Sequence, residues 1–259
     1  MIALGALAGL LLLPQQEVGG CPSLMEDAQR SISARRADDA VLAIDLAIRA
    51  CPPRAELHVS LAQLLFLKND GPGAERALKT ALAIDARHTG ARYALGRLYY
   101  EQKRYPEAVA ELDKVVAADP KYFKAWDNLG LCHDVLHNDA QALKSFFCAL
   151  DIVMKEQPAY DWAHANLADF FLRREQYEKA FQLANEAARR NPESARNALI
   201  AGKALVKLDK HELSLRWLEQ AVKLDPAQKD AWYVLSQSYR RMERRDDAAK
   251  ALEKFRALP

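Results

Sequence analysis

Two short stretches of this 259-residue chain match each other at a separation of 34 residues. Residues 92–100 read RYALGRLYY and residues 126–130 read WDNLG, so a long or aromatic side chain, a leucine and a glycine recur in the same order. A third copy contains Trp232, Leu235 and Tyr239. A fixed period of this length is the signature of a repeat protein in which each repeat is one supersecondary unit.

The period extends from Cys21 to the end of the chain when Cys21 is numbered place 1. Place 8 of each unit is a small residue, and so is place 20. The residues at place 8 are Ala28, Ala62, Gly96, Gly130, Ala168, Gly202 and Ser236. Those at place 20 are Ala40, Ala74, Ala108, Ala142, Ala180, Ser214 and Ala248. Pro52, Pro120, Pro192 and Pro226 close four of the units.

This pattern predicts two antiparallel helices in each unit and an all-α fold. Small residues at places 8 and 20 let the helix axes approach closely, large residues such as Leu95 and Leu129 at place 7 fill the space between them, and the proline stops the second helix. Only 10 Gly and 11 Pro occur in the chain, few for a protein of many tight β-hairpins. One helical hairpin cannot bury its own apolar faces, so neighbouring units must stack.

The repeat resembles the tetratricopeptide repeat (TPR) family over residues 21–259. The resemblance implies a right-handed α-solenoid of seven stacked helix-turn-helix units with a concave groove. The expected units are 21–54, 55–88, 89–122, 123–160, 161–194, 195–228 and 229–259, after a separate segment at 1–20. The fourth unit is four residues longer than the others, and we expect residues 153–160 to lengthen its connection to the fifth.

The turn between the two helices of a unit lies at place 15, which is commonly glycine in the family. It is never glycine here. Asn69 and His137 tolerate a left-handed backbone better than Arg35 or Glu175 would.

The resemblance also implies a binding surface, because the first helices of a TPR stack line its concave wall. Places 2, 5, 6, 9, 12 and 13 of each unit are expected to point inward. In the third to fifth units the expected groove residues are Tyr93, Arg97, Tyr100, Lys124, Asp127, Asn128, Leu131, Asp134, Trp162, Asn166, Asp169 and Arg173. In the sixth and seventh they are Lys203, Lys207, Tyr233, Gln237 and Arg240.

Aromatic rings beside polar donors suit an extended peptide, since rings contact apolar side chains and amides pair with the peptide backbone. Asn128 and Asn166 share place 6 in adjacent units and resemble a two-rung asparagine ladder, although two solvated asparagines on polar faces are an equal alternative. Some TPR domains clamp a terminal carboxylate with lysine at place 5. This chain has the acidic Asp127 at that place, which disfavours recognition of this kind. Acidic residues in the middle and basic residues later in the chain predict a protein or peptide partner of mixed charge.

The N-terminal residues predict export. Residues 2–13 form an apolar or small-residue run closed by Pro14, shorter than the about 20 residues needed to cross a bilayer and typical of a secretory signal. Val18 and Gly20 suit a cut before Cys21, although no basic residue precedes the run. We expect an exported, periplasmic or secreted protein with no stable membrane span after processing; a lipoprotein anchored through Cys21 and a helix packed on a core are the alternatives.

The four cysteines fall into two pairs. Cys21 and Cys51 occupy places 1 and 31 of the first unit, which lie side by side in an antiparallel hairpin, so we expect a disulfide. Such a bond would exclude lipidation of Cys21. Cys132 and Cys148 are offset across their hairpin and are expected to be small core residues.

No catalytic residues and no cofactor are predicted. His133 and His137 have the spacing of a zinc-binding helix, but no third ligand is evident, and we interpret both as structural. The 37 basic and 35 acidic residues leave a net charge of +2, which gives no electrostatic case for nucleic acid or an anionic membrane. Glycine-rich phosphate loops and nucleophile elbows are absent from the sequence.

We therefore expect a non-catalytic scaffold that binds an extended protein segment in its groove, in a bacterial cell envelope. One alternative is a structural subunit that uses its outer face or C-terminal edge inside a larger assembly. A remote one is a metal-dependent hydrolase built on His133 and His137. Weak self-association through the C-terminal repeat is a further expectation, because Leu252 and Phe255 leave that end partly apolar.

Overall fold

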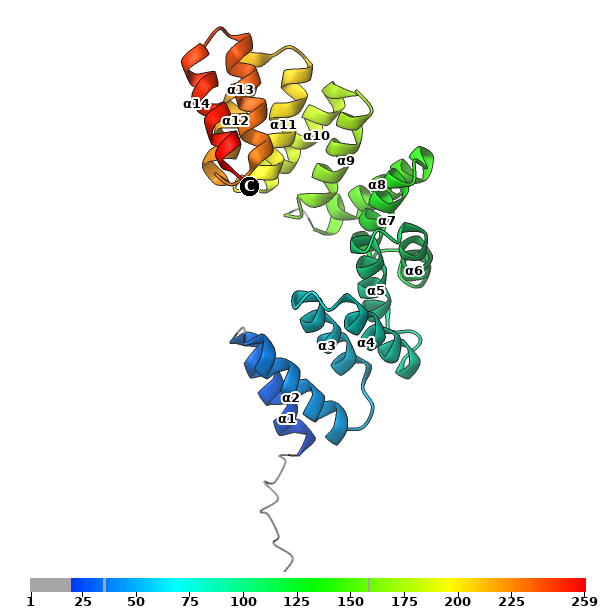
Figure 1. Cartoon of the computed structure of the whole chain (residues 1–259). Helices are drawn as coiled ribbons and strands as arrows, with labels where there is room; N and C mark the ends of the chain where they lie inside the picture. The colour runs from blue at the N-terminus through cyan, green and yellow to red at the C-terminus, as the bar shows by residue number, and fades with distance from the viewer. Residues whose placement is uncertain (1–19, 35, 158) are drawn as a thin grey trace, which may run out of the picture. The chain divides into compact units, whose positions relative to one another are not determined.

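The computed structural model describes residues 20–34, 36–157 and 159–259, and within them fourteen α-helices and no strand (Figure 1). The helices of the first half are α1 (Cys21–Ser33), α2 (Ala37–Ala50), α3 (Ala55–Leu67), α4 (Gly71–Ile84), α5 (Thr89–Glu101), α6 (Tyr105–Ala118) and α7 (Phe123–Val135). Those of the second half are α8 (Asp139–Glu156), α9 (Trp162–Arg173), α10 (Tyr177–Arg190), α11 (Ala195–Lys207), α12 (His211–Leu224), α13 (Lys229–Arg241) and α14 (Arg245–Ala257).

Consecutive helices pack in pairs. Helices α1, α3, α5 and α7 begin 34 residues apart, and so do α11 and α13. Contacts join α1 to α2, α3 to α4, α7 to α8, α9 to α10, α11 to α12 and α13 to α14. The sequence period is therefore the period of a helical hairpin, and the chain has the all-α fold that its repeat predicts.

The chain divides into two compact units, residues 1–98 and residues 99–259. In the first, the interior of the α1–α2 hairpin is built from Ala28, Ala40 and Ile44, which pack with Leu64 of α3. Each of these four residues is at most 7% exposed. The small residues lie where the pattern requires the two helices to approach each other.

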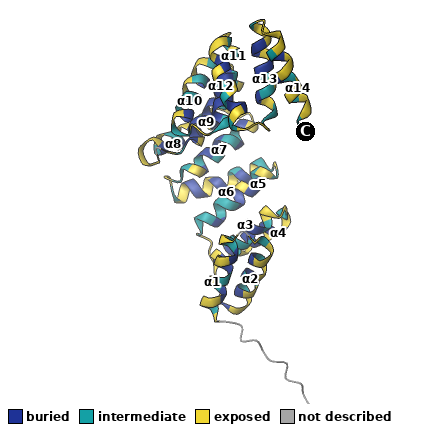
Figure 2. Cartoon of the chain, turned by 90° about the vertical axis from the view of Figure 1, so that its left-hand side faces the viewer, coloured by how far each residue is buried: buried dark blue, intermediate teal, exposed yellow. Residues whose placement is uncertain are grey.

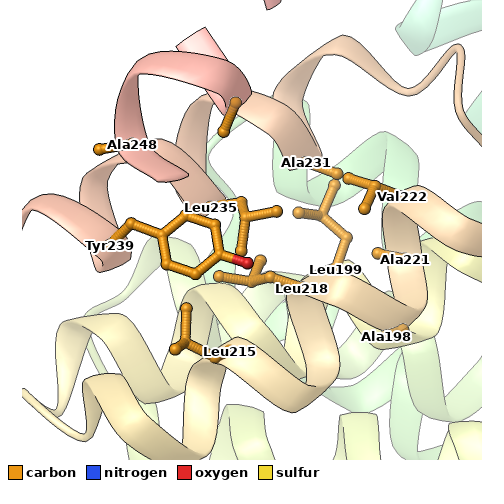
Figure 3. Packing of buried hydrophobic residues seen from close by; sticks show 11 residues of the cluster. Ala198, Leu199, Leu215, Leu218, Ala221, Val222, Ala231, Leu235, Tyr239 and Ala248 are labelled. Atoms are coloured by element: carbon orange, nitrogen blue, oxygen red, sulfur yellow. The ribbon is translucent and has the colours of Figure 1, made fainter. Parts of the chain in front are cut away.

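In the second unit, each hairpin shares its core with the next. One cluster joins α11, α12, α13 and α14, and Figure 3 shows Tyr239 and Leu235 of α13 facing Leu215 and Leu218 of α12. Figure 2 shows that buried residues follow one side of these helices and exposed residues the other. The stacking of neighbours therefore supplies the burial that a single hairpin lacks.

Close approach of paired helices is sharpest at two glycines of place 8. A Cβ atom added to Gly130 would lie 2.5 Å from the ring of Phe146, and one added to Gly202 would lie 2.6 Å from Leu218. Phe146 and Leu218 are both fully buried on the facing second helix. Glycine at these positions is therefore a packing requirement, because Phe146 and Leu218, each the 24th residue of its unit, fill the volume of the missing side chain.

The helix–helix turns have a left-handed residue at place 15. Asn69, Lys103, His137, Glu175, Asp209 and Glu243 have φ between 57° and 60°. Asparagine adopts this conformation readily, whereas glutamate and lysine do so at a cost. Arg35, the equivalent residue of the first hairpin, lies outside the described residues.

The additional residues of the fourth unit lengthen a helix and not only the connection after it. Helix α8 has 18 residues, against 14 in α6 and in α10. We predicted a longer connection over 153–160, and the structure corrects this for residues 153–156. The reason is packing: Val153 is fully buried in a cluster with Ala149 and Ala163, and this burial stabilises one more helical turn.

At the start of the described chain, Cys21 and Cys51 form a disulfide with their Cα atoms 5.1 Å apart. It joins the first turn of α1 to the residue that ends α2, as the hairpin geometry predicts. The predicted export signal at 1–20 lies outside the described residues except for Gly20. No described helix combines the length and the apolar character needed to cross a membrane.

Candidate functional site

Three first helices of the second unit are connected by a line of polar side chains. Asn166 of α9 donates from Nδ2 to Oδ2 of Asp127 on α7 at 2.8 Å. Arg196 of α11 donates to Oδ1 of the same asparagine at 2.7 Å. The Arg196 guanidinium also lies 4.9 Å from the ring centre of Trp162. This line, Asp127–Asn166–Arg196–Trp162, is called the polar row below.

The polar row runs from the interior to the surface. Asp127 and Asn166 are each 3% exposed, whereas Trp162 is 52% exposed. Burial raises the pKa of Asp127 to about 6, although the hydrogen bond from Asn166, the charge of Arg196 and the Tyr160 hydroxyl all act to lower it. At pH 7 the Asp127 carboxyl is therefore ionised in most molecules. The amide of Asn166 and the guanidinium of Arg196 offset its buried charge.

A second polar link lies at the start of α9. Asp161, which is 7% exposed, accepts from Asn197 Nδ2 at 2.7 Å and from Asn191 Nδ2 at 3.3 Å. Asn197 is on α11, so this carboxylate also connects two neighbouring hairpins. The two links together fix how α11 sits against α9.

A third link lies at the other end of the same helices. Asp134 of α7 pairs with both Arg173, the last residue of α9, and Arg174, which caps that helix. Arg173 also pairs with Asp169, and Arg174 with Asp139. The hydrogen bond from Arg174 lowers the pKa of Asp139. The carboxylates of this end are therefore satisfied by arginines of the protein itself.

The residues predicted to line a groove differ in exposure. Those that are exposed are Arg97, Lys124, Trp162, Arg173, Lys207, Tyr233, Gln237 and Arg240. Those of intermediate exposure are Tyr93, Tyr100, Asn128, Leu131, Asp169 and Lys203, and the buried ones are Asp127, Asp134 and Asn166. Arg97 lies 6.0 Å from the ring centre of Tyr93 within the first unit. Leu131 packs against the core cluster of Phe146.

The two asparagines at place 6 have different environments. The amide of Asn128 donates to the carbonyl of Lys124 in its own helix at 2.7 Å. The amide of Asn166 is buried and occupied on both sides by Asp127 and Arg196. Asn166 thus orients protein side chains, and the exposed Trp162 and the half-buried Arg196 are the parts of the polar row that a ligand can reach.

Sequence reasoning did not select Arg196, Arg174 or Asn197. For Arg196 a signal was present, because it occupies place 2 of its unit, the same place as Lys124 and Trp162. Arg174 and Asn197 lie at places 14 and 3, outside the set of places that the resemblance assigns to the inner wall. Their contacts with Asp134 and Asp161 depend on the neighbouring hairpin, and no pattern within one unit shows them.

The histidines and free cysteines form no constellation with the spacing of a site. His137 is the left-handed turn residue, and burial lowers the pKa of His133. Cys132 is fully buried, and this burial raises the pKa of its thiol to about 12. Within the part of the chain that the structure describes, no three His, Cys, Asp or Glu residues are grouped to hold a metal ion.

Two family models match different parts of the chain. Residues 65–129 match the tetratricopeptide repeat model, and residues 140–259 match the model of ChAPs, the Chs5p-Arf1p-binding proteins. Among curated proteins, the type IV pilus assembly protein PilF of Pseudomonas aeruginosa is 28% identical over 156 residues. That match covers 60% of each protein, so the chain spans less than two thirds of this relative's length.

Solved structures share the fold along most of the chain. A tetratricopeptide repeat protein from Parabacteroides merdae superimposes with a TM-score of 0.72 at 15% identity, covering 92% of this chain and 93% of that one. P. aeruginosa PilF gives 0.68 at 20% identity, covering 86% and 96%. YrrB, described as a TPR protein with an unusual peptide-binding site, gives 0.54 at 21% identity, covering 74% and 97%.

The repeated hairpins and these structural matches define an all-α helical-repeat solenoid, the class of fold that serves as a protein–protein interaction scaffold. Within that class, residues 65–129 match the tetratricopeptide repeat, and the fold along most of the chain is that of a solved tetratricopeptide repeat protein.

Proposed function

We propose that this protein is a non-catalytic scaffold that binds an extended segment of a partner protein along the first helices of residues 99–259. The observation that carries the proposal is the polar row, in which buried Asp127 and Asn166 hold Arg196 against the exposed ring of Trp162. A large aromatic ring held beside a cation and exposed to solvent is a contact surface with little conformational freedom left to lose on binding.

The proposed surface continues along equivalent helices. Tyr233 of α13 is 45% exposed, with its ring centre 5.2 Å from that of Phe255. Gln237 and Arg240 follow on the same helix and are exposed. Aromatic rings and polar donors at repeated spacing suit an extended peptide. The rings can contact its apolar side chains, and the polar groups can form hydrogen bonds with its backbone.

We place this scaffold in a bacterial cell envelope, in the assembly of a type IV pilus or a related machine. The similarity to PilF supports this assignment, as does PilW, described as a type IV pilus biogenesis factor, whose structure gives a TM-score of 0.71. The Cys21–Cys51 disulfide agrees with an oxidising compartment. The apolar run at residues 2–13 agrees with export.

A matched pair of variants tests the binding surface. Trp162→Ala with Tyr233→Ala removes two exposed rings from first helices, and Phe147→Ala with Met154→Ala removes two exposed apolar side chains from the second helix α8. Cross-linking in cells and affinity purification of each variant, followed by mass spectrometry, measures which partners remain. We expect the first variant to lose partners that the second retains; retention of every partner by the first contradicts the proposal.

A second candidate is a structural subunit that docks through its second helices. Phe147 and Met154 are 51% and 59% exposed on α8 and support this alternative. The same experiment separates the two candidates, because loss of partners only in the Phe147→Ala, Met154→Ala variant supports docking through α8.

A further inference from the structure

The acidic and basic side chains of the proposed binding surface differ in how far they are paired within the protein. On α7, α9, α11 and α13, the acidic residues at the places expected to face inward are Asp127, Asp134, Asp169 and Asp230. Asp134 and Asp169 pair with Arg173, and Asp230 pairs with Lys203 at 3.0 Å. Asp127 is buried and linked through Asn166 to Arg196. Each carboxylate thus has a cation of the protein beside it or one residue away.

The cations of the same helices are in excess. Lys124, Lys207 and Arg240 are exposed, and none of the three is ion-paired within the residues that the structure describes. They occupy places 2, 13 and 12 of their units, the places that hold Arg196, Arg173 and Asp134 in other units. A partner that approaches these helices therefore meets positive charge, although the sequence contains acids and bases in similar numbers.

Arg196 adds a directed donor to this positive surface. A guanidinium carries five N–H groups in a fixed plane, and the contact with Asn166 uses one of its nitrogens. The stacked ring of Trp162 and the amide of Asn166 fix its orientation, which suits it to a carboxylate. An apolar side chain beside that carboxylate would contact the exposed face of Trp162.

Resting on the proposed function, we infer that the partner segment is acidic and carries aspartate or glutamate next to a large apolar side chain. The carboxylate pairs with Arg196, the apolar side chain packs on Trp162, and further acidic residues lie near Lys124, Lys207 and Arg240. Complementary charge at an interface sets specificity and speeds association, and its contribution weakens with added salt.

Selection from random 12-residue peptides displayed on phage tests the inference on the full chain. We expect the enriched peptides to carry more Asp and Glu than Lys and Arg, relative to the starting library. A synthetic peptide from the enriched set should then bind about tenfold more weakly to the Arg196→Gln, Lys207→Gln variant, which corresponds to about 1.4 kcal/mol. Isothermal titration calorimetry at two salt concentrations measures this loss.

Control variants separate a local effect from net charge and from folding. Lys144→Gln with Arg216→Gln removes two exposed cations from the second helices α8 and α12 and should change the affinity less than twofold. Lys207→Gln alone leaves the polar row intact and should weaken binding by about threefold, with stronger loss at low salt.

The outcomes distinguish this inference from the function on which it rests. Enriched peptides that are neutral or basic, but that lose binding in the Trp162→Ala, Tyr233→Ala variant, overturn the acidic partner and keep the scaffold proposal. Peptides that bind equally well to that variant, or the absence of any enrichment over bare support, overturn both.

Discussion

Asn166 lies between a buried carboxylate and an arginine, donating to Asp127 at 2.8 Å and accepting from Arg196 at 2.7 Å. The three residues come from α7, α9 and α11, so a single amide side chain connects three consecutive hairpins. A side-chain amide is suited to this place because it both donates and accepts. The stability of a repeat protein depends on the interfaces between neighbouring units. Removing this contact therefore tests how strongly the hairpins of residues 99–259 depend on it.

Replacing Asn166 by alanine should lower the free energy of unfolding by about 2–3 kcal/mol at pH 7.5, because it removes the amide donor from the buried Asp127 carboxylate. Asn128→Ala is the matched control, since Asn128 holds the same place in the preceding unit, is only half-buried, and donates to the carbonyl of Lys124 in its own helix. It should cost less than about 0.5 kcal/mol. Urea unfolding followed by circular dichroism measures both values, and equal losses would show that the polar row contributes nothing particular.

Asp127→Asn should change how stability depends on pH. The pKa of Asp127 is about 6 in the folded chain and 3.8 in its unperturbed state, so the folded form binds a proton more readily than the unfolded form. Its burial therefore costs most above pH 6, and folding gains stability as the pH falls from 6 to 4. Relative to wild type, the variant should be most favoured at pH 7.5, with an advantage that shrinks by roughly 2.4 kcal/mol by pH 4.

Comparison with wild type isolates this group from other titrations. Burial lowers the pKa of His164 to about 4, so this histidine destabilises the folded chain as the pH falls through the same range. The effect is the same in wild type and variant, and it cancels when their stabilities are subtracted. Denaturant unfolding at pH 4, 5, 6 and 7.5 gives the two curves. A constant difference across this range would show that Asp127 does not titrate abnormally.

The sequence was sufficient for the helices because their determinants lie within one unit. Small residues at places 8 and 20 and the closing prolines repeat every 34 residues, and the six described place-15 residues all adopt the left-handed turn. The extension of α8 was not foreseen, because it depends on Val153 packing with Ala163 of the next hairpin.

The candidate site was less predictable for the same physical reason. Place numbering identifies which residues face the same side of a first helix, and it brought Asp127, Trp162 and Asn166 into one set. It does not show which of them bond to each other, since each bond joins two units. Arg196 was missed, and Asn166 was expected to face a ligand, because the pattern carries no information about their contact.

Removal of the disulfide in Cys21→Ser, Cys51→Ser should destabilise the first hairpin locally. A cross-link between residues 30 positions apart contributes about 3–4 kcal/mol in the chain-entropy account. Hydrogen exchange measured by mass spectrometry should become faster in α1 and α2 and stay unchanged in α13 and α14, because repeats interact mainly with their neighbours. Cys148→Ser, at a free cysteine of α8, is the control. Unchanged exchange in α1 and α2 would contradict a clamping role.

Glu175→Gly should raise stability by about 0.5–1 kcal/mol, because Glu175 is exposed and has φ of 58°, where an L-residue is strained and glycine is not. The gain is reduced by the larger entropy of glycine in the unfolded chain. Asn69→Gly makes the same change at a residue that tolerates this conformation, so it should gain less. Thermal unfolding of both variants measures the difference, and a loss at Glu175 would point to an unrecognised role of its side chain.

Gly130→Ala should lower the free energy of unfolding by about 1–2 kcal/mol, although alanine is the better helix former. The added Cβ would lie 2.5 Å from the ring of Phe146, which is fully buried and would have to shift within the packed core. Overpacking of this kind costs about 1–3 kcal/mol, and the gain in helix propensity, about 1 kcal/mol, offsets part of it.

Phe146→Leu alone should also destabilise by leaving a cavity. The double variant should be more stable than the sum of the two losses predicts, because the smaller leucine makes room for the new methyl group. Urea unfolding of all four proteins gives the coupling energy; simple additivity would show that the two side chains do not compete for the same space.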